Sequence, residues 1–171
     1  MRNLDVRIVH LEPSRVVAAY AFGSSPEMHA WESLLSWAKS KGLLNAPNAP
    51  ALPRFFGFNN PVPDPGSPNY GYEQWMTVAP DVTADLTASV TADMIANSEV
   101  QAKEFSGGLY AVTRCRLSEI RETWKRLTEW NEEGPYRLAH HQWLEECLTP
   151  PVPVTGTERD LVYDLYLPIA K

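Results

Sequence analysis

Residues 163–170 (YDLYLPIA) alternate apolar and polar positions as a β-strand does, and they closely resemble residues 72–79 (YEQWMTVA). The likeness between the two parts of the chain extends further. The helical pattern of residues 31–37 (WESLLSW) reappears at residues 124–130 (WKRLTEW), at nearly the same offset. Three matches in one order are hard to attribute to chance. We therefore interpret the chain as a duplication, with residues 16–18 (VVA) and 109–111 (LYA) as the matching strands before each helix.

Each half reads as strand–helix–strand–strand. The first repeat covers about residues 5–80 and the second about residues 100–170, with an insertion at about 81–99. A unit of this kind covers only one face of its sheet with a helix. We therefore expect one domain over residues 1–171, of the α+β class. It would contain a duplicated module with pseudo-two-fold symmetry, an antiparallel sheet with helices on one face, and a ligand groove between the halves.

The element boundaries follow from local signals. The first helix is predicted from residue 26 to about 41 and ends at Gly42, and the second runs from about 118 to 133 with Ser118 as its cap. Residues 100–116 read as a strand with a bulge or bend at its two glycines, whereas residues 140–148 fit a helix or a strand. Residues 83–94 (TADLTASVTADM) fit a short amphipathic helix, a flexible flap or a surface insertion without a role.

Composition excludes several classes of function. The net charge of the 171 residues is −6 and the basic residues are scattered, so no nucleic-acid partner is expected. No apolar run approaches the roughly 20 residues of a membrane span. With only two cysteines, a disulfide framework is not expected and a reducing cytoplasm is the simplest location. We expect a monomer or weak dimer without a cofactor or metal, although His141 and Glu145 could share a helical face.

Alternation also predicts which residues face a ligand. Leu165 and its alternate neighbours in the last strand should lie under the helices, together with Gln74 and its neighbours in the matching strand. The opposite face would then carry Glu73 and Trp75 in one half, and Asp164 and Tyr166 in the other. Carboxylates beside aromatic rings suit a binding groove, and a solvated outer face is the other interpretation.

Several motifs resemble the GyrI-like small-molecule-binding family, which is related to the effector-binding domains of multidrug-sensing regulators of the AraC and MerR types. They are residues 69–75 (NYGYEQW), 107–112 (GGLYAV), 124–130, Tyr136, 143–146 (WLEE) and 165–169 (LYLPI). The resemblance implies a duplicated fold with a groove, aromatic walls and a functional glutamate. It further implies polyspecific binding of lipophilic, often cationic aromatic drugs, and some stand-alone members hydrolyse cyclopropane-bearing genotoxins.

The resemblance places the functional glutamate at Glu145, and a slip of one residue would make it Glu146. Glu73 is the second candidate. The expected walls of the groove are the aromatic side chains of Trp75, Tyr110, Trp130, Tyr136, Trp143 and Tyr166.

Three functions fit this pattern. The first is a stand-alone binding protein for lipophilic, often cationic aromatic ligands, because cations stack on aromatic faces and a carboxylate neutralises them. The alternative is a hydrolase that opens strained cyclopropanes, with Glu145 and Glu73 as its catalytic residues. A weaker alternative is an inhibitor that acts by binding another protein.

Overall fold

The computed structural model describes residues 4–44, 53–78, 100–149 and 161–171. The predicted insertion at 81–99, with its TADL-type repeats, lies outside these residues. The chain divides into two compact units. The first unit spans Ser14–Phe105, and the second unit combines Met1–Pro13 with Ser106–Lys171. The units therefore have boundaries different from those of the sequence repeats, because the N-terminal strand packs with the second half.

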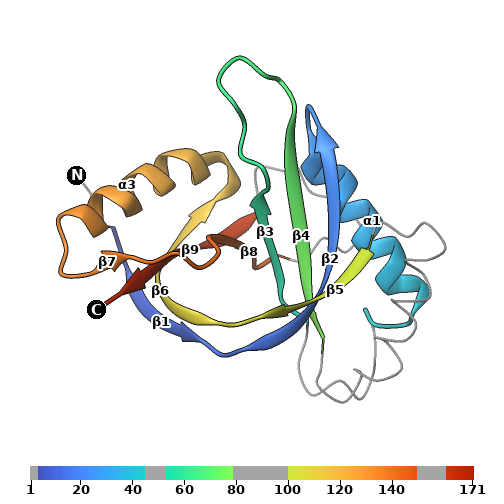
Figure 1. The fold of residues 1–171 in the computed structure, drawn as a ribbon, viewed down its shortest axis with the longest axis horizontal. Coiled ribbons are helices and arrows are strands. Elements are labelled where there is room, and N and C mark those ends of the chain that lie inside the picture. The colour runs from blue at the N-terminus through green and yellow to red at the C-terminus, as the bar shows by residue number, and fades with distance from the viewer. Residues whose placement is uncertain (1–3, 45–52, 79–99, 150–160) are drawn as a thin grey trace. The chain divides into compact units, whose positions relative to one another are not determined.

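The first unit is an antiparallel sheet with strand order β3-β4-β2-β5 and one helix, α1, on one face (Figure 1). Its elements are β2 (Ser14–Gly23), α1 (Pro26–Ser40), β3 (Phe55–Asn59), β4 (Tyr70–Val78) and β5 (Val100–Phe105).

The strand register of the first unit decides which side chains face the helix. Val17 pairs with Met76 and Ala19 with Gln74, so these residues share one face, while Ala18 and Trp75 share the other. The buried cluster that contains Val17 and Met76 also contains Leu34 of α1. This confirms the predicted helix-covered face of β4. The same cluster includes Ala19, Trp37, Ala38, Phe55 and Val100, with Val78 packed against it.

Helix α1 ends as the sequence predicts. Gly42 has φ of 68°, a left-handed conformation, and its N–H donates to the Lys39 carbonyl at 3.1 Å. The Leu43 N–H donates to the Ala38 carbonyl at 3.0 Å. These two hydrogen bonds form a Schellman motif, which satisfies carbonyls that the helix leaves without partners.

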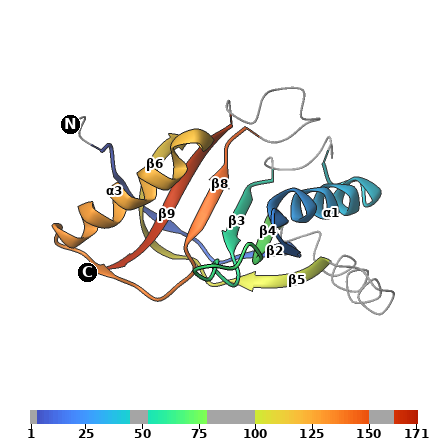
Figure 2. The ribbon, with the colours of Figure 1, turned by 90° about the horizontal axis from the view of Figure 1, so that it is seen from above.

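The second unit is also an antiparallel sheet, with strand order β1-β6-β9-β8, and α3 lies along β6 and β9 (Figures 1 and 2). Leu127 of α3 is fully buried against this sheet. The elements are β1 (Arg7–Leu11), β6 (Gly108–Arg116), the 3-10 turn η2 (Leu117–Glu119), α3 (Ile120–Glu132), β7 (Arg137–Leu138), β8 (Leu144–Cys147) and β9 (Val162–Ala170), with β7 pairing the end of β9.

Two predicted elements differ in the structure. Residues 100–116 form two strands, because β5 pairs with β2 in the first unit whereas β6 pairs with β1 and β9 in the second. The bend lies at Gly107, with φ of 71°, where a Cβ would collide with the Leu11 carbonyl oxygen. Ser118 does not cap the second helix. It lies inside η2, whose start is stabilised by the Glu119 carboxylate accepting from the Arg116 N–H at 3.3 Å.

Within the described residues the strand orders of the two units correspond in part, because β2, β3 and β4 take the same positions in the first sheet as β6, β8 and β9 take in the second, with a helix after β2 and after β6. The outer strand differs, because β5 follows β4 in the sequence whereas β1 precedes β6. A duplication as the origin of this likeness stays a prediction. Residues 140–148, which fit either helix or strand, contain β8. Neither of the two α-helices in the described residues contains an apolar stretch that could cross a bilayer.

A buried carboxylate links three strands of the second unit. Asp164 on β9 is only 3% exposed. It accepts from Arg7 on β1 at 2.7 Å and from Arg114 on β6 at 2.8 and 3.0 Å. Burial alone would raise the pKa of Asp164, but the hydrogen bonds and charges of the two arginines outweigh this effect and lower it.

The left-handed cap predicts a difference between two Gly→Ala substitutions. Neither Gly42 nor Gly23 has a neighbour where a Cβ would sit, and only Gly42 has a positive φ. We expect Gly42→Ala to lower the free energy of unfolding by about 1 kcal/mol, because alanine is strained in this conformation. Urea unfolding checks this, with Gly23→Ala as the control that changes stability little. Equal effects of the two substitutions would contradict the expectation.

The pairing of Asp164 predicts a pH-dependent contribution to stability. Its folded-state pKa lies below the unfolded value of about 3.9, so the ionised carboxylate stabilises the fold above that pH. We expect the difference in unfolding free energy between wild type and Asp164→Asn to be largest at neutral pH. It should shrink as the pH falls below about 4 and through the folded-state pKa. Glu104→Gln, which breaks an exposed ion pair with Arg15, serves as the control with a small effect. A difference independent of pH would refute this role for Asp164.

Candidate functional site

The structure separates the two adjacent glutamates of β8 onto opposite faces of the sheet. Glu145 pairs with Leu165 and Cys147 pairs with Tyr163, on the face that α3 covers. Glu146 pairs with Asp164 on the other face. A strand has a period of two, so a shift of one residue in the sequence corresponds to a change of face.

Glu145 contacts the indole of Trp124, which in turn packs against the indole of Trp143. The Nε1–H of Trp124, on α3, donates to the Glu145 carboxylate at 2.8 Å. The rings of Trp124 and Trp143 are tilted by 39° with centroids 5.3 Å apart. All three side chains are half-buried, so the group is partly open to solvent. We refer to Glu145, Trp124 and Trp143 as the Glu145 cluster.

Three titratable groups near the Glu145 cluster stay neutral at physiological pH. Burial raises the pKa of the Cys115 thiol to about 11, and the charge of Glu145 contributes to this rise. Burial raises the pKa of Tyr163 as well, and the Cys147 side chain and the charge of Glu145 add to this rise. Cys147, whose pKa burial also raises, completes this set. These thiols and this phenol are therefore poor nucleophiles and bases, and Glu145 is the side chain of the group suited to carry a charge.

Glu146, Tyr166 and Tyr110 form a buried group on the opposite face. The Tyr166 hydroxyl donates to the Glu146 carboxylate at 2.5 Å, and the Tyr110 ring meets the Tyr166 ring edge-on at 5.7 Å. The Tyr110 hydroxyl donates to the Gln142 carbonyl at 2.9 Å, and burial raises the Tyr110 pKa. Tyr110 is fully buried and the other two nearly so. These predicted site residues therefore form part of the core in this structure.

Glu73 and Trp75 lie on the predicted face of the first unit, but they are buried there. The Glu73 carboxylate accepts from Lys103 at 2.5 Å, from the Trp75 Nε1–H at 2.7 Å and from Asn60 at 3.2 Å. The Trp75 ring packs against Phe58 and Phe105. A cation of the protein thus compensates the charge of Glu73, whereas in the contact described above Glu145 accepts from a neutral indole.

The last two predicted aromatic residues stack on each other near the end of α3. The Trp130 and Tyr136 rings are 6.4 Å apart with an interplanar angle of 23°, and both side chains are half-buried. Of the predicted site residues, the structure thus places Glu145 and Trp143 beside the same side chain, Trp124. Trp124 is not among the aromatic residues expected to form the walls of the groove.

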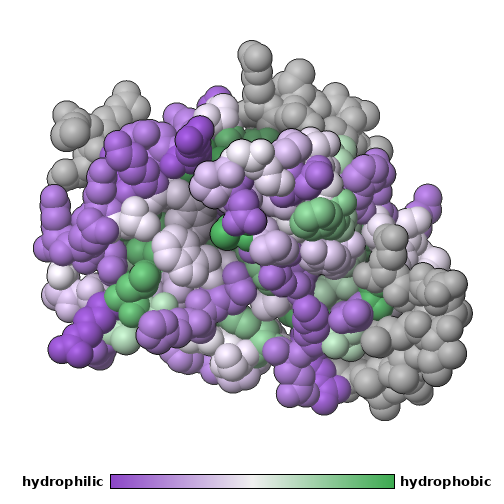
Figure 3. Space-filling model, turned by 45° about the horizontal axis from the view of Figure 1, so that its top comes forward, coloured by the Kyte–Doolittle hydropathy of each residue, from purple (hydrophilic) through white to green (hydrophobic). Residues whose placement is uncertain are grey.

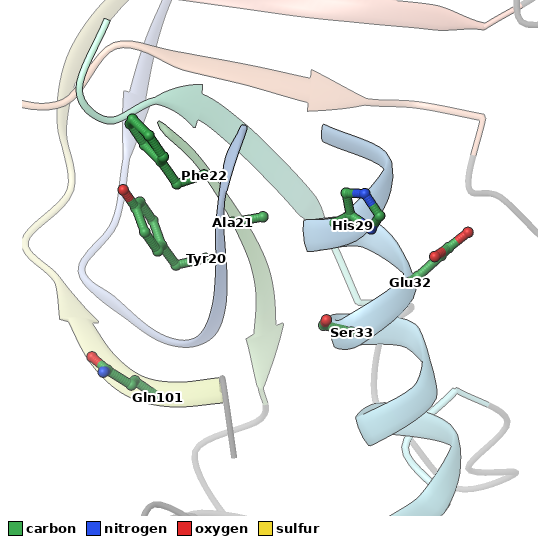
Figure 4. Close-up of a pocket in the computed structure, with 7 residues that line it drawn as sticks. All are labelled: Tyr20, Ala21, Phe22, His29, Glu32, Ser33 and Gln101. Atoms are coloured by element: carbon green, nitrogen blue, oxygen red, sulfur yellow. The ribbon is translucent and has the colours of Figure 1, made fainter. Parts of the chain in front are cut away.

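A pocket of about 520 Å³ in the first unit contains none of the predicted site residues. In Figure 4, Tyr20 and Phe22 extend from one side of β2, Ala21 points toward α1, and the Glu32 carboxylate points away from both aromatic rings. Tyr20 is 43% exposed and Phe22 61% exposed. Their exposure cannot be read from an apolar strand sequence. The remaining lining residues are His29, Ser33 and Gln101.

The histidine considered for a metal site has another role. His141 Nε2 lies 3.0 Å from the Leu109 carbonyl oxygen, and its ring meets Tyr110 edge-on at 4.7 Å. It also fills the space above Gly108, where a Cβ would lie 2.6 Å from the imidazole. Within the described ranges, no group of three or more histidine, cysteine, aspartate or glutamate side chains could hold a metal ion.

Comparisons with solved structures show the same fold in proteins of low identity. A hydrolase from Listeria innocua aligns with 96% of this chain and 91% of its own, at 14% identity and a TM-score of 0.66. The C-terminal domain of EcmrR aligns with 98% of each chain, at 9% identity and a TM-score of 0.62. SAV2435, solved with tetraphenylphosphonium bound, aligns with 98% of this chain and 94% of its own, at 10% identity and a TM-score of 0.53.

Comparison of the sequence with known families identifies the family of this chain. No match was found among curated protein sequences. The sequence profile of the GyrI-like small molecule binding domain matches residues 4–170, which is nearly the whole chain. This match, together with the shared fold, shows that the chain belongs to the family of GyrI-like small-molecule-binding domains.

Proposed function

We propose that the chain binds lipophilic aromatic cations and that the Glu145 cluster supplies both the charge and part of the aromatic surface. The observation that carries this proposal is the contact between the half-buried Glu145 carboxylate and the Trp124 indole, with Trp143 beside them. The binding of tetraphenylphosphonium, a lipophilic aromatic cation, by SAV2435 supports the same class of ligand.

Two interactions would contribute to the affinity for such a cation. A cation over an indole face gains about 0.5–2 kcal/mol, and more of this is kept when water is excluded. A partly buried carboxylate adds Coulombic attraction that depends only weakly on the pose of the ligand. Stacking tolerates many substituents, so such a site can accept ligands of different shape. The combination favours polyspecific binding over recognition of a single compound.

The other candidate carboxylates suit this role less well. Glu73 is already paired with Lys103, and Glu146 is buried against the Tyr166 hydroxyl. A ligand cation at either position would have to break a buried contact, which is costly. Glu145 is only half-buried, so a ligand cation can approach its carboxylate from solvent.

Removal of the Glu145 charge should weaken the binding of cations selectively. We expect Glu145→Gln to lower the affinity for tetraphenylphosphonium about tenfold, because the Coulombic attraction is lost while the indoles remain. Binding of triphenylphosphine oxide, a neutral compound with similar phenyl rings, should change little. Isothermal titration calorimetry measures both affinities.

Glu133→Gln is the matched control, since it removes the same charge from an exposed residue after α3. It should leave both affinities near the wild-type values. The assignment of Glu145 is wrong if wild type binds neither compound. It is also wrong if the two variants lower the affinity for tetraphenylphosphonium equally.

Hydrolysis of a strained cyclopropane is the second candidate function, and the same carboxylate favours it. The Listeria innocua protein of this fold is described as a hydrolase. In such a reaction the Glu145 carboxylate would take a proton from water while the water oxygen bonds to a ring carbon. The ring C–C bond would break, and its electron pair would move toward a conjugated carbonyl, which is then protonated.

This candidate predicts turnover as well as binding. Incubation with a cyclopropane conjugated to a dienone should give a product heavier by one water, detected by mass spectrometry. Glu145→Gln should slow this conversion by about 100-fold or more, as expected for loss of a general base, while Glu133→Gln retains it. A product formed equally fast by all three proteins would exclude Glu145 as the base.

The third interpretation, a protein-binding inhibitor, has less support in the structure. In Figure 3, hydrophilic residues cover most of the described surface on the face shown, and hydrophobic residues appear as small separate patches. A contiguous apolar patch would favour this function.

A further inference from the structure

One edge of the first sheet is open where β2 continues past the start of β5. Because β5 begins at Val100, opposite Ala19, no strand of the described residues pairs with Tyr20–Gly23 on that side. Figure 1 shows the end of β2 extending beyond β5. The sequence of this segment, YAFG, contains neither a charged residue nor a proline, which are the residues that commonly protect an exposed edge from pairing. We refer to Tyr20–Gly23 as the β2 edge.

The backbone of the β2 edge presents hydrogen-bonding groups to the open side. On β4, the Gly71 N–H donates to the Pro61 carbonyl at 3.2 Å, and the Gly71 carbonyl accepts from the Asn60 N–H at 2.8 Å. Opposite residues of an antiparallel pair exchange two hydrogen bonds or none, so Gly71 forms none with its partner Phe22. Phe22 therefore directs its N–H and carbonyl toward the open side, and Tyr20 does so two residues earlier.

The pocket of the first unit lies along the β2 edge. Tyr20, Ala21 and Phe22 are consecutive residues, and all three line the pocket. In Figure 4 the side chains of Tyr20 and Phe22 leave β2 on one side, whereas Ala21 points toward α1. An occupant that contacts consecutive residues on both faces must lie at the edge between these faces, where a neighbouring strand would lie. Gln101 of β5, which holds this position further along β2, lines the pocket as well.

The two sides of the pocket differ in their chemistry. The exposed rings of Tyr20 and Phe22 form the side away from α1. On the other side α1 contributes His29, Glu32 and Ser33, and among the described residues no lysine or arginine lines the pocket. Glu32 is exposed, so its charge is available to a ligand. A strand in the pocket would thus place apolar side chains beside the two rings and a basic side chain toward α1.

We propose that the β2 edge binds an extended peptide segment as an additional antiparallel strand, with a basic residue between two apolar residues. The apolar residues lie opposite Tyr20 and Phe22 and exchange main-chain hydrogen bonds with them. The basic residue lies opposite Ala21 and directs its side chain toward Glu32. Pairing of this kind relies on main-chain groups and does not need a large apolar patch. The site does not involve the Glu145 cluster, which belongs to the second unit.

Selective N-methylation of a short peptide tests the main-chain pairing in the wild-type protein. The probe is acetyl-Thr-Val-Lys-Val-Thr-amide, whose two valine N–H groups face β2 in the proposed register, while the lysine N–H faces away. Methylation of the first valine nitrogen removes a hydrogen bond to Phe22 and should weaken binding about tenfold. Methylation of the lysine nitrogen is the matched control and should change the affinity little. NMR titration measures the three dissociation constants.

Glu32→Gln tests the preference for a basic residue. It should lower the affinity for the unmethylated peptide about threefold, because an exposed ion pair is worth little. The affinity for the same peptide with norleucine in place of lysine should not change. Glu133→Gln removes the same charge from an exposed residue of the second unit and should leave both affinities near the wild-type values. Equal effects of the two substitutions would show that Glu32 does not select the basic residue.

Hydrogen exchange distinguishes the peptide from other occupants of the β2 edge. The Tyr20 and Phe22 amides should exchange rapidly in the free protein, and the peptide should protect both of them. Protection before the peptide is added would mean that another segment of the chain already pairs with the edge. Protection that rises with protein concentration would mean that a second copy does so. Either result overturns the inference, as does the absence of binding or equal binding of the three peptides that differ in methylation.

Discussion

Each sheet depends on a buried carboxylate in an inner strand that is neutralised by a cation two strands away. In the first unit Glu73 of β4 reaches Lys103 of β5 across β2, and in the second Asp164 of β9 reaches Arg7 of β1 across β6. A buried charge without its partner would destabilise the fold strongly. The pairing therefore holds the outer strand of each sheet, and it lies on the sheet face that the helix leaves uncovered.

The parts of the fold that depend on local signals could be predicted from the sequence. Alternation identified the helix-covered face of β4, and a glycine at the required position identified the end of α1. The burial of the opposite face could not be predicted, because its cations come from distant positions. Arg7 and Asp164 are separated by 157 residues, and no local pattern links them. The same limit explains the division of residues 100–116, since the two strands pair with different neighbours.

The candidate site was only partly predictable for a related reason. Residues 143–146 contain two adjacent glutamates, and a one-residue uncertainty in the start of β8 exchanges their faces. The register places Glu145 with the indole of Trp124 and Glu146 with the phenol of Tyr166. Trp124 is not among the expected walls of the groove, yet its polar N–H is what contacts the carboxylate.

The placement of β1 has a consequence for how the protein is made. The first unit is continuous in sequence, so it can fold as soon as residue 105 has left the ribosome. The second unit is complete only after β9 has been synthesised, because Arg7 lies on β1 and its partner Asp164 lies on β9. Its contacts are thus among the least local in the molecule, and contacts of this kind form slowly. β1 has no strand partner until β6 has been synthesised, and a chain stalled between β6 and β9 would contain Arg7 without the carboxylate that neutralises it.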